Sequence, residues 1–172
     1  MEKEFKGYEC YPWWSVLFDN LVTLSLYAAG FYFLYLIWPW AMIIFFLYLI
    51  YLERALYKEG CVHCYYYGKV CHSGRGAIAK LFYKRGDPKV FLEKTVTFKE
   101  FLPQFLPNLV VLVAGIYLLV FRGFNWLILL LTFWPVAVFF LNQVTFGRLA
   151  CPHCRQAEIG CPVYDMFAPK EK

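Results

Sequence analysis

Charged residues are scarce in this chain and unevenly distributed. Asp, Glu, Lys and Arg make up only 17% of its 172 residues, and none lies between Asp19 and Glu53. Hydrophobic residues account for 61% and aromatic residues for 22%, and they are collected into long runs. A soluble domain of this size cannot bury so much apolar surface. The composition therefore excludes a soluble globular protein and predicts an integral membrane protein.

Histidine is also rare, and its positions exclude one kind of cofactor site. The chain has three histidines, all within or beside clusters of cysteines. No pair is available inside the apolar runs to hold a b-type haem, and neither cluster has the C-x2-C-H pattern of covalent haem attachment. The apolar runs also contain almost no ionisable residues, which argues against a transport pathway through them.

Four apolar runs predict four membrane-spanning helices, because about 20 apolar residues cross the core of a bilayer as a helix. The runs that we assign to spans are 17–38, 41–52, 108–121 and 126–146. The second and third are short, and we expect both to continue as helices beyond the bilayer core. Short turns at 38–40 and 122–125 join the spans into two hairpins, with Pro39 expected at the first position of the second helix. The expected fold is an all-α integral membrane protein.

The basic residues indicate the orientation of the spans. Of the 17 Lys and Arg residues, 16 lie in the N-terminal segment, the central loop or the C-terminal tail, and only Arg122 lies in a hairpin turn. Lys and Arg are retained on the cytoplasmic side during insertion. We therefore expect a multi-pass protein of the cell membrane with both termini in the cytoplasm.

Two cysteine clusters of identical spacing are the most specific motif of the chain. Each is a C-x-H-C segment, followed after a gap of six residues by a third cysteine. We call the segments knuckle 1 (61–64) and knuckle 2 (151–154). Six of the seven cysteines thus obey one spacing rule. The members of the two clusters are Cys61, His63, Cys64 and Cys71, and Cys151, His153, Cys154 and Cys161.

The repeat extends into the apolar runs. Asn20-Leu21-Val22 opens the first run and Asn108-Leu109-Val110 opens the third, and Lys58 or Arg148 precedes each knuckle by three positions. A repeat with two spans keeps its orientation, so a pseudo-twofold axis along the membrane normal can relate the two copies and bring the knuckles together. The expected segments are a first repeat over 1–72, a linker over 73–106, a second repeat over 107–162 and a flexible tail over 163–172.

A cytoplasmic location favours metal ligation or redox chemistry for these thiols over structural disulfides. In a first interpretation, the four knuckle cysteines form a tetrahedral zinc site that holds the two hairpins together. That site leaves Cys71 and Cys161 unused, although they repeat as faithfully as the others.

In a second interpretation, each repeat supplies three thiolates to an iron–sulfur cluster, and a histidine supplies the fourth ligand. His63 and His153 are the symmetric candidates for that ligand, and imidazole in place of thiolate raises a cluster's potential. The spacing C-x2-C-x6-C is not one of the common ferredoxin patterns. We favour iron–sulfur over zinc because it uses all six cysteines and both histidines, and we expect electron transfer at the membrane surface, as a subunit or partner of a redox complex.

A third interpretation is dithiol chemistry. Cys151-Pro152-His153-Cys154 resembles the active-site tetrapeptide of the oxidant branch of the thioredoxin superfamily, and that resemblance implies a reactive disulfide. It covers four residues only, and no βαβ pattern surrounds them. Four-helix membrane thiol oxidases place their cysteines on the external side, whereas the external turns expected here contain none.

The linker contains the signals of short helices. Residues 77–85 form an amphipathic basic pattern, Asp87-Pro88 is a helix start, and Thr97-x-x-Glu100 is a capping box. We expect these helices on the lipid surface, where each basic residue gains about 1 kcal/mol from anionic headgroups. A redox partner protein could dock on the same face. The net charge of +5 is explained by the positive-inside bias, so no nucleic-acid partner is expected.

Polar residues at the cytoplasmic ends of the spans allow two interpretations. Capping and interfacial hydrogen bonding are common at span ends and are the preferred one. The alternative is a polar niche for a quinone headgroup, with Asp19, Glu53 and Arg54 as its candidate residues. Cys10 has no counterpart in the second repeat, and we expect it at the interface and not among the ligands.

Overall fold

The computed structural model of the chain describes residues 7–93, 98–161 and 164. The expected capping box at Thr97 lies outside the described residues, as does the expected tail over 163–172 apart from Tyr164. In the described ranges the chain is all-helical, with one isolated bridge between Tyr8 and Cys154 and no strand.

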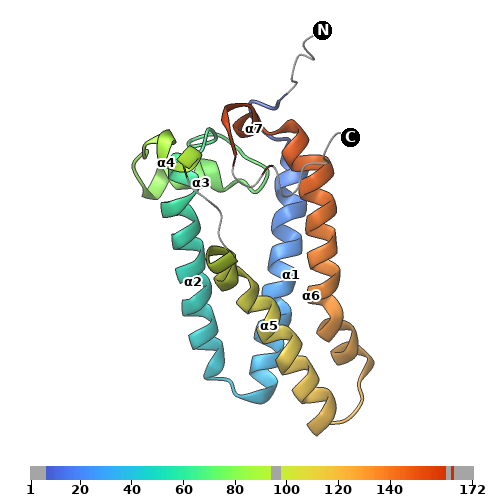
Figure 1. Ribbon diagram of the computed structural model, residues 1–172. Coiled ribbons are helices and arrows are strands. Elements are labelled where there is room, and N and C mark those ends of the chain that lie inside the picture. Colours follow the sequence, from blue (N-terminus) through green and yellow to red (C-terminus); the bar gives the residue numbers. More distant parts are fainter. Residues whose placement is uncertain (1–6, 94–97, 162–163, 165–172) are drawn as a thin grey trace. The chain divides into compact units, whose positions relative to one another are not determined.

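The elements follow one another as long helices separated by short helices and turns (Figure 1). Short 3₁₀ helices form at both knuckles, and a π-helix joins α6 to knuckle 2. The helices are α1 (Trp13–Ile37), α2 (Ala41–Glu59), η1 (Cys61–His63), α3 (Arg75–Phe82), α4 (Pro88–Glu93), α5 (Phe98–Phe121), α6 (Trp126–Thr145), η2 (Phe146–Ala150), η3 (Cys151–His153) and α7 (Arg155–Ile159).

Among the residues that the structure describes, three helical stretches are long and apolar enough to cross a membrane, which is consistent with a membrane protein. They are Trp13–Ile37, Leu102–Phe121 and Trp126–His153. Helix α2 differs because its apolar part ends at Leu52, and its last turns carry Glu53, Arg54 and Lys58. Twelve apolar residues of α-helix extend about 18 Å, which is less than the thickness of a bilayer core.

Several boundaries differ from those expected. Helix α1 begins at Trp13, four residues before the expected start, and α2 begins at Ala41. Pro39 therefore lies in the turn and not at the first helical position, and its carbonyl accepts a hydrogen bond from Met42 N–H at 3.1 Å. The linker helix ends at Phe82 instead of Arg85, and the helix expected after Asp87 is present as α4.

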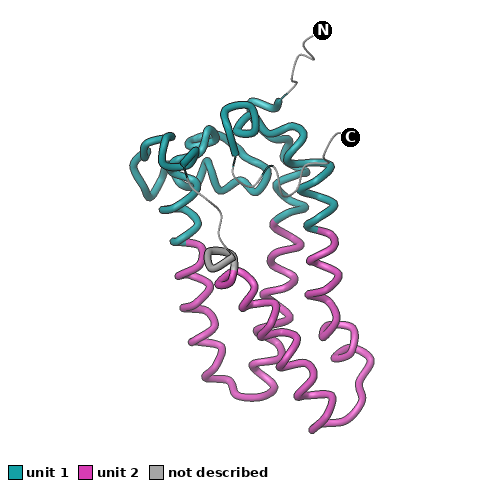
Figure 2. The backbone as a smooth tube through the Cα atoms, viewed as in Figure 1, with its two compact units in different colours: residues 1–19, 54–96, 142–172 teal, residues 20–53, 97–141 magenta. Residues whose placement is uncertain are grey.

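The described residues divide into two compact units (Figure 2). Unit 1 comprises 1–19, 54–96 and 142–172 and contains all seven cysteines. Unit 2 comprises 20–53 and 97–141 and contains the middle parts of the long helices. Every candidate metal ligand therefore belongs to a single unit.

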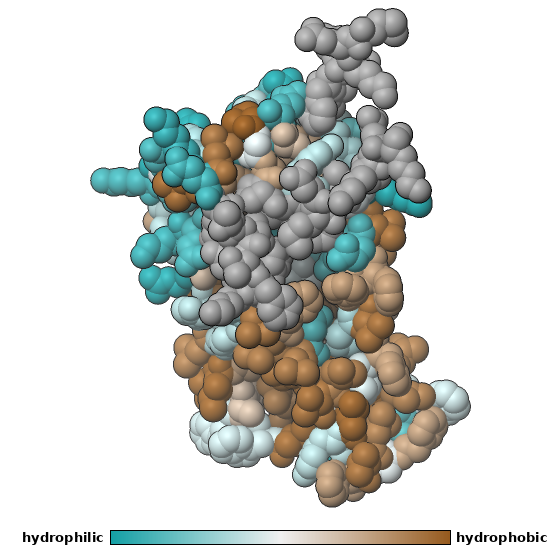
Figure 3. Space-filling model, in the orientation of Figure 1, coloured by the Kyte–Doolittle hydropathy of each residue, from teal (hydrophilic) through white to brown (hydrophobic). Residues whose placement is uncertain are grey.

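Unit 2 is held together by close packing of its helices. Phe33 of α1 and Leu118 of α5 are fully buried in one cluster, and Phe45 and Leu49 of α2 centre a second. Gly115 allows α5 to approach its neighbours, because a Cβ there would overlap Thr132 Oγ1 and lie 2.8 Å from Phe33 Cε2. Small residues at contacts of this kind are typical of membrane helices. The outer face of α5 and α6 carries mostly hydrophobic side chains (Figure 3).

Two prolines inside α5 leave backbone carbonyls without their usual helical donor. Pro107 has no N–H to give to the carbonyl of Pro103, four residues earlier. The Tyr48 hydroxyl of α2 donates to that carbonyl at 2.8 Å. In a lipid environment a backbone carbonyl without a partner is costly, so this cross-helix bond replaces the missing helical one.

We expect Tyr48→Phe to lower the free energy of unfolding in detergent by about 1 kcal/mol, because the Pro103 carbonyl loses its donor. In a Pro107→Ala background the same change should have almost no effect, since the backbone N–H of the introduced alanine then donates to that carbonyl. Tyr51→Phe, an exposed position on the same helix, is the matched control. Equal losses in both backgrounds would contradict this account of the bond.

Candidate metal centre

The two knuckles adopt the same backbone turn. Each forms a 3₁₀ turn in which the fourth residue donates its N–H to the carbonyl of the first, from Cys64 to Cys61 at 3.4 Å and from Cys154 to Cys151 at 3.2 Å. Cys64 and Cys154 then both leave the turn in extended conformation. The sequence repeat is thus also a repeat of local structure, with two cysteines of each knuckle on one tight turn.

The knuckles are neighbours within unit 1. The N–H of Tyr65, directly after knuckle 1, donates to Gln156 Oε1 at 2.6 Å, and the N–H of Arg155, directly after knuckle 2, donates to the Tyr66 hydroxyl at 3.1 Å. Tyr66 is 2% exposed, and both bonds are partly buried. Two segments 90 positions apart in the sequence are therefore joined by hydrogen bonds.

The N-terminal segment 7–12 contacts knuckle 2 and the loop that follows knuckle 1. The Tyr8 N–H donates to the His153 carbonyl at 2.9 Å, and the Tyr8 carbonyl accepts from the Tyr66 hydroxyl at 2.7 Å. Tyr11 donates from its hydroxyl to the Ala150 carbonyl at 2.7 Å. This segment thus links the two repeats, a role that no sequence pattern indicated.

A charged network on the surface adds to these links. Glu9 accepts from Lys69 at 2.8 Å and pairs with Arg155 at 2.7 Å. The hydrogen bond from Lys69 lowers the pKa of Glu9, with smaller contributions from Tyr65 and Arg155. Because Glu9 is exposed, solvent screens these charges, and the network orients the segment more than it stabilises it.

The thiols of the two clusters lie close enough to affect one another's ionisation. The pKa of the Cys64 thiol is raised to about 12, mainly by burial and to a smaller extent by the neighbouring Cys154, Cys71 and Cys61 thiols, while the Tyr66 N–H acts in the opposite direction. Burial also raises the pKa of Cys154, with Cys161 and Cys71 acting in the same direction. The pKa of Cys154 is therefore affected by thiols of both repeats.

The third cysteines belong to the same group. Cys71 accepts the Gly76 N–H on its sulfur at 3.3 Å, and it influences the thiols of both Cys64 and Cys154. All seven cysteines are free thiols. Within the described ranges no three Cys, His, Asp or Glu side chains are grouped tightly enough, as they stand, to enclose a metal ion.

The knuckle histidines have partners other than the thiols. His63 Nδ1 lies 2.8 Å from the carbonyl oxygen of Asp87, and its ring occupies the space beside Gly86. The His153 ring packs against Tyr8, with 4.9 Å between ring centroids. Ligation by these two histidines stays a prediction.

Asp19 is at the centre of a buried polar cluster in unit 1. It is 7% exposed, and its carboxylate lies 3.8 Å from His72 Nε2 and 3.9 Å from Arg75. His72 Nδ1 lies 2.5 Å from Ser15 Oγ, while Nε2 is buried without a hydrogen bond to any described residue. Burial lowers the pKa of His72, and Asp19 opposes that shift.

Of the three residues predicted for a quinone niche, only Asp19 is buried. Glu53 is partly buried and Arg54 is exposed, both on α2, whereas Asp19 lies beside His72 and Arg75 of the central loop. The niche therefore stays a prediction.

Sequence reasoning missed most of the residues that organise this centre. Tyr11, Tyr66 and Gln156 are buried and connect the knuckles, but tyrosine and glutamine at these positions carry no spacing signal. His72 and Asp19 did have a signal, since His72 follows a cluster cysteine and Asp19 is an acid at the edge of an apolar run. What the sequence lacked was evidence that these two side chains meet.

Comparisons with known protein families, with curated proteins and with solved structures find no match for this chain.

Proposed function

We propose that this chain is a multi-pass membrane protein whose two cysteine knuckles share one thiolate-ligated metal centre on the cytoplasmic face. The observation that carries the proposal is the contact inside unit 1 between the segments directly after the two knuckles, through Tyr65 with Gln156 and Arg155 with Tyr66. Two C-x2-C turns of the same geometry on neighbouring segments are a familiar way to present thiolates to one metal.

The state of the thiols supports the same function. Buried thiols that raise one another's pKa hold their protons, and a cation placed among them would reverse both the burial effect and the mutual repulsion. Backbone N–H groups of Tyr66 and Gln156 face the sulfurs of Cys64 and Cys154 and favour the thiolate form. Metal binding would require the cysteine side chains to turn toward one another between staggered rotamers.

We propose electron transfer through an iron–sulfur cluster as the role of this centre. Cys71 raises the pKa of a thiol in each knuckle, Cys64 and Cys154. Its nearness to both favours a ligand set larger than the four knuckle cysteines. A structural zinc site is the second candidate. It is favoured by the contacts that tie the N-terminal segment, knuckle 1 and knuckle 2 into one unit, because joining distant segments is what structural zinc does.

The membrane arrangement that we propose has four spans in two tandem hairpins, with α2 as the shortest span. The bias of Lys and Arg toward the termini and the central loop supports cytoplasmic termini. The exposed basic side chains of α3 and α4, Lys80 and Lys89 among them, would then contact anionic lipid headgroups or an acidic redox partner.

Anaerobically purified protein tests the centre directly. We expect bound iron and broad absorption near roughly 400 nm, as thiolate-bound iron–sulfur clusters give. Cys71→Ser and Cys161→Ser should each lower the metal content, because the third cysteines belong to the ligand set. A colourless protein that binds stoichiometric zinc, and retains it in both variants, would support the zinc site. A metal-free protein with titratable thiols would overturn the metal centre in favour of dithiol chemistry.

A further inference from the structure

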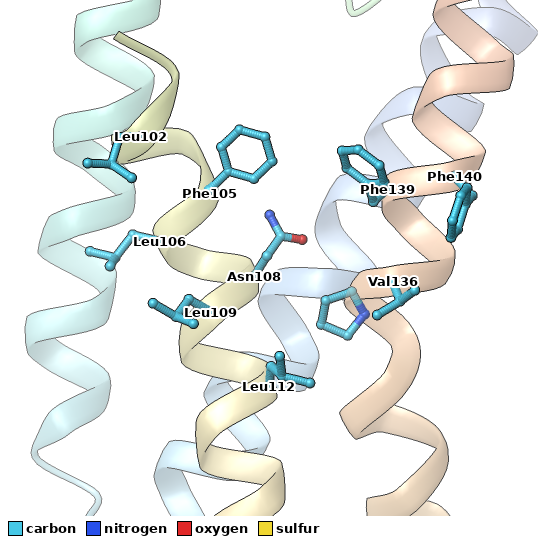
Figure 4. A pocket seen from close by; sticks show the side chains of 10 residues that line it. Leu102, Phe105, Leu106, Asn108, Leu109, Leu112, Val136, Phe139 and Phe140 are labelled. Atoms are coloured by element: carbon cyan, nitrogen blue, oxygen red, sulfur yellow. The ribbon is translucent and has the colours of Figure 1, made fainter. Parts of the chain in front are cut away.

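Unit 2 contains a pocket of about 440 Å³ between α5 and α6. The two helices are in close contact at Gly115 and Thr132 and separate with distance from the turn that joins them (Figure 1). The pocket opens where they separate, and its walls are hydrophobic side chains of both helices (Figure 4). Its volume is in the range of sites that hold small organic ligands.

One polar side chain interrupts this apolar lining. The Asn108 amide projects from α5 into the space between the helices, with Phe105 on its own helix and Phe139 on α6 beside it (Figure 4). No hydrogen bond to this amide is found among the residues that the structure describes. Its repeat counterpart Asn20, by contrast, does interact with another residue. An amide without a partner is costly in an apolar environment, so a ligand that bonds to Asn108 gains affinity from it.

The lining restricts the chemistry of that ligand. Its described residues include no Lys, Arg or His, so none of them attracts the phosphate of a phospholipid. The Phe105 and Phe139 rings, with centroids 6.3 Å apart, offer aromatic surface to a flat ring. The amide N–H₂ can donate to a carbonyl oxygen. A flat, apolar, membrane-soluble molecule with ring carbonyls satisfies all three conditions, whereas an acyl chain leaves the amide without a partner.

We propose that this pocket binds the headgroup of an isoprenoid quinone, with a ring carbonyl accepting a hydrogen bond from Asn108 and the apolar tail leaving toward the lipid. The site is separate from the niche predicted around Asp19. It goes beyond the metal centre and does not depend on it, since every residue involved belongs to unit 2.

The test uses the full chain in quinone-free phosphatidylcholine nanodiscs, titrated with decylubiquinone and followed by quenching of tryptophan fluorescence. We expect saturable binding that Asn108→Leu weakens about tenfold, the loss of roughly one hydrogen bond. Asn108→Gln, which retains an amide, should restore part of the affinity. Phe139→Ala should weaken binding about three- to tenfold. Phe133→Ala, an exposed ring on α6 outside the pocket, should not.

A photoreactive azidoquinone should label peptides of α5 and α6, and competition with decylubiquinone should suppress the labelling. The proposal is overturned if the wild-type protein shows no saturable binding, if Asn108→Leu binds as tightly as the wild type, or if the label maps to other helices. A phospholipid that copurifies and resists displacement, or a dimer lost in Asn108→Leu, would assign the pocket to lipid or to a second copy. Metal content is measured in parallel and should be unchanged in every variant, so failure of this site and failure of the metal centre are distinguishable.

Discussion

Replacing Cys154 with serine is expected to reduce the metal content of the purified protein to below about one tenth of the wild-type value. Cys154 lies near thiols of both clusters, because it raises the pKa of Cys64 of the first repeat, and both Cys71 and Cys161 raise its own pKa. Changes to groups that only support a ligand cost 10- to 100-fold in affinity, and in the shared centre that we propose, loss of Cys154 as a ligand should cost at least as much. Metal analysis and the visible spectrum provide the measurement.

Cys10→Ser is the matched control for this prediction. Cys10 is exposed and lies outside both clusters, so its replacement should leave metal content and spectrum unchanged. Thermal unfolding of both variants separates loss of metal from loss of fold. If Cys154→Ser retains full metal content while Cys61→Ser or Cys64→Ser loses it, the two knuckles do not share one centre.

The helical framework could be read from the sequence because it depends on local and compositional properties. Charge-free apolar runs, the Trp38–Trp40 turn and the Asp87-Pro88 helix start all reflect physics that acts within a few residues. The missed features depend on tertiary contacts instead. Tyr48 of α2, for example, donates to the Pro103 carbonyl, a contact with no signal in the sequence. The continuation of the third span before residue 108 was expected and is confirmed, since α5 runs through Pro103 and Pro107.

The cysteines of the candidate site stand out in the sequence, whereas the residues packed around them do not, and metal ligation by the cysteines stays a prediction. The repeated spacing identified six cysteines. The two knuckles adopt the same kind of backbone turn, because in each the fourth residue donates the same 3₁₀ hydrogen bond to the first. No spacing rule predicts that Tyr8 bonds to both His153 and Tyr66, or that Gln156 accepts the Tyr65 N–H. Those contacts require knowledge of which segments meet in space, and a single sequence does not contain it.

Gly76→Ala is expected to destabilise unit 1 by at least about 2 kcal/mol and to reduce its metal content. Gly76 lies in α3, where alanine by intrinsic propensity would stabilise the helix by up to about 1 kcal/mol. A Cβ at this position, however, would overlap the carbonyl oxygen of Tyr66 and lie 2.7 Å from that of Lys69. Both obstacles are backbone atoms, so neither can rotate away, and the steric cost exceeds the gain in propensity.

The structural disturbance caused by Gly76→Ala should extend to both repeats, because the 66–69 loop contacts residues of each. Gly76 donates its N–H to the Cys71 sulfur and accepts the Gly68 N–H at 2.8 Å, while the Tyr66 hydroxyl accepts the Arg155 N–H. Gly123→Ala is the control. It lies in the α5–α6 turn, where an added Cβ would have no neighbour within 4 Å, and its φ of +88° predicts a cost of roughly 1 kcal/mol without loss of metal. Thermal unfolding and metal analysis measure both effects, and a Gly76→Ala protein as stable as the wild type would mean that α3 does not approach the Tyr66 carbonyl so closely.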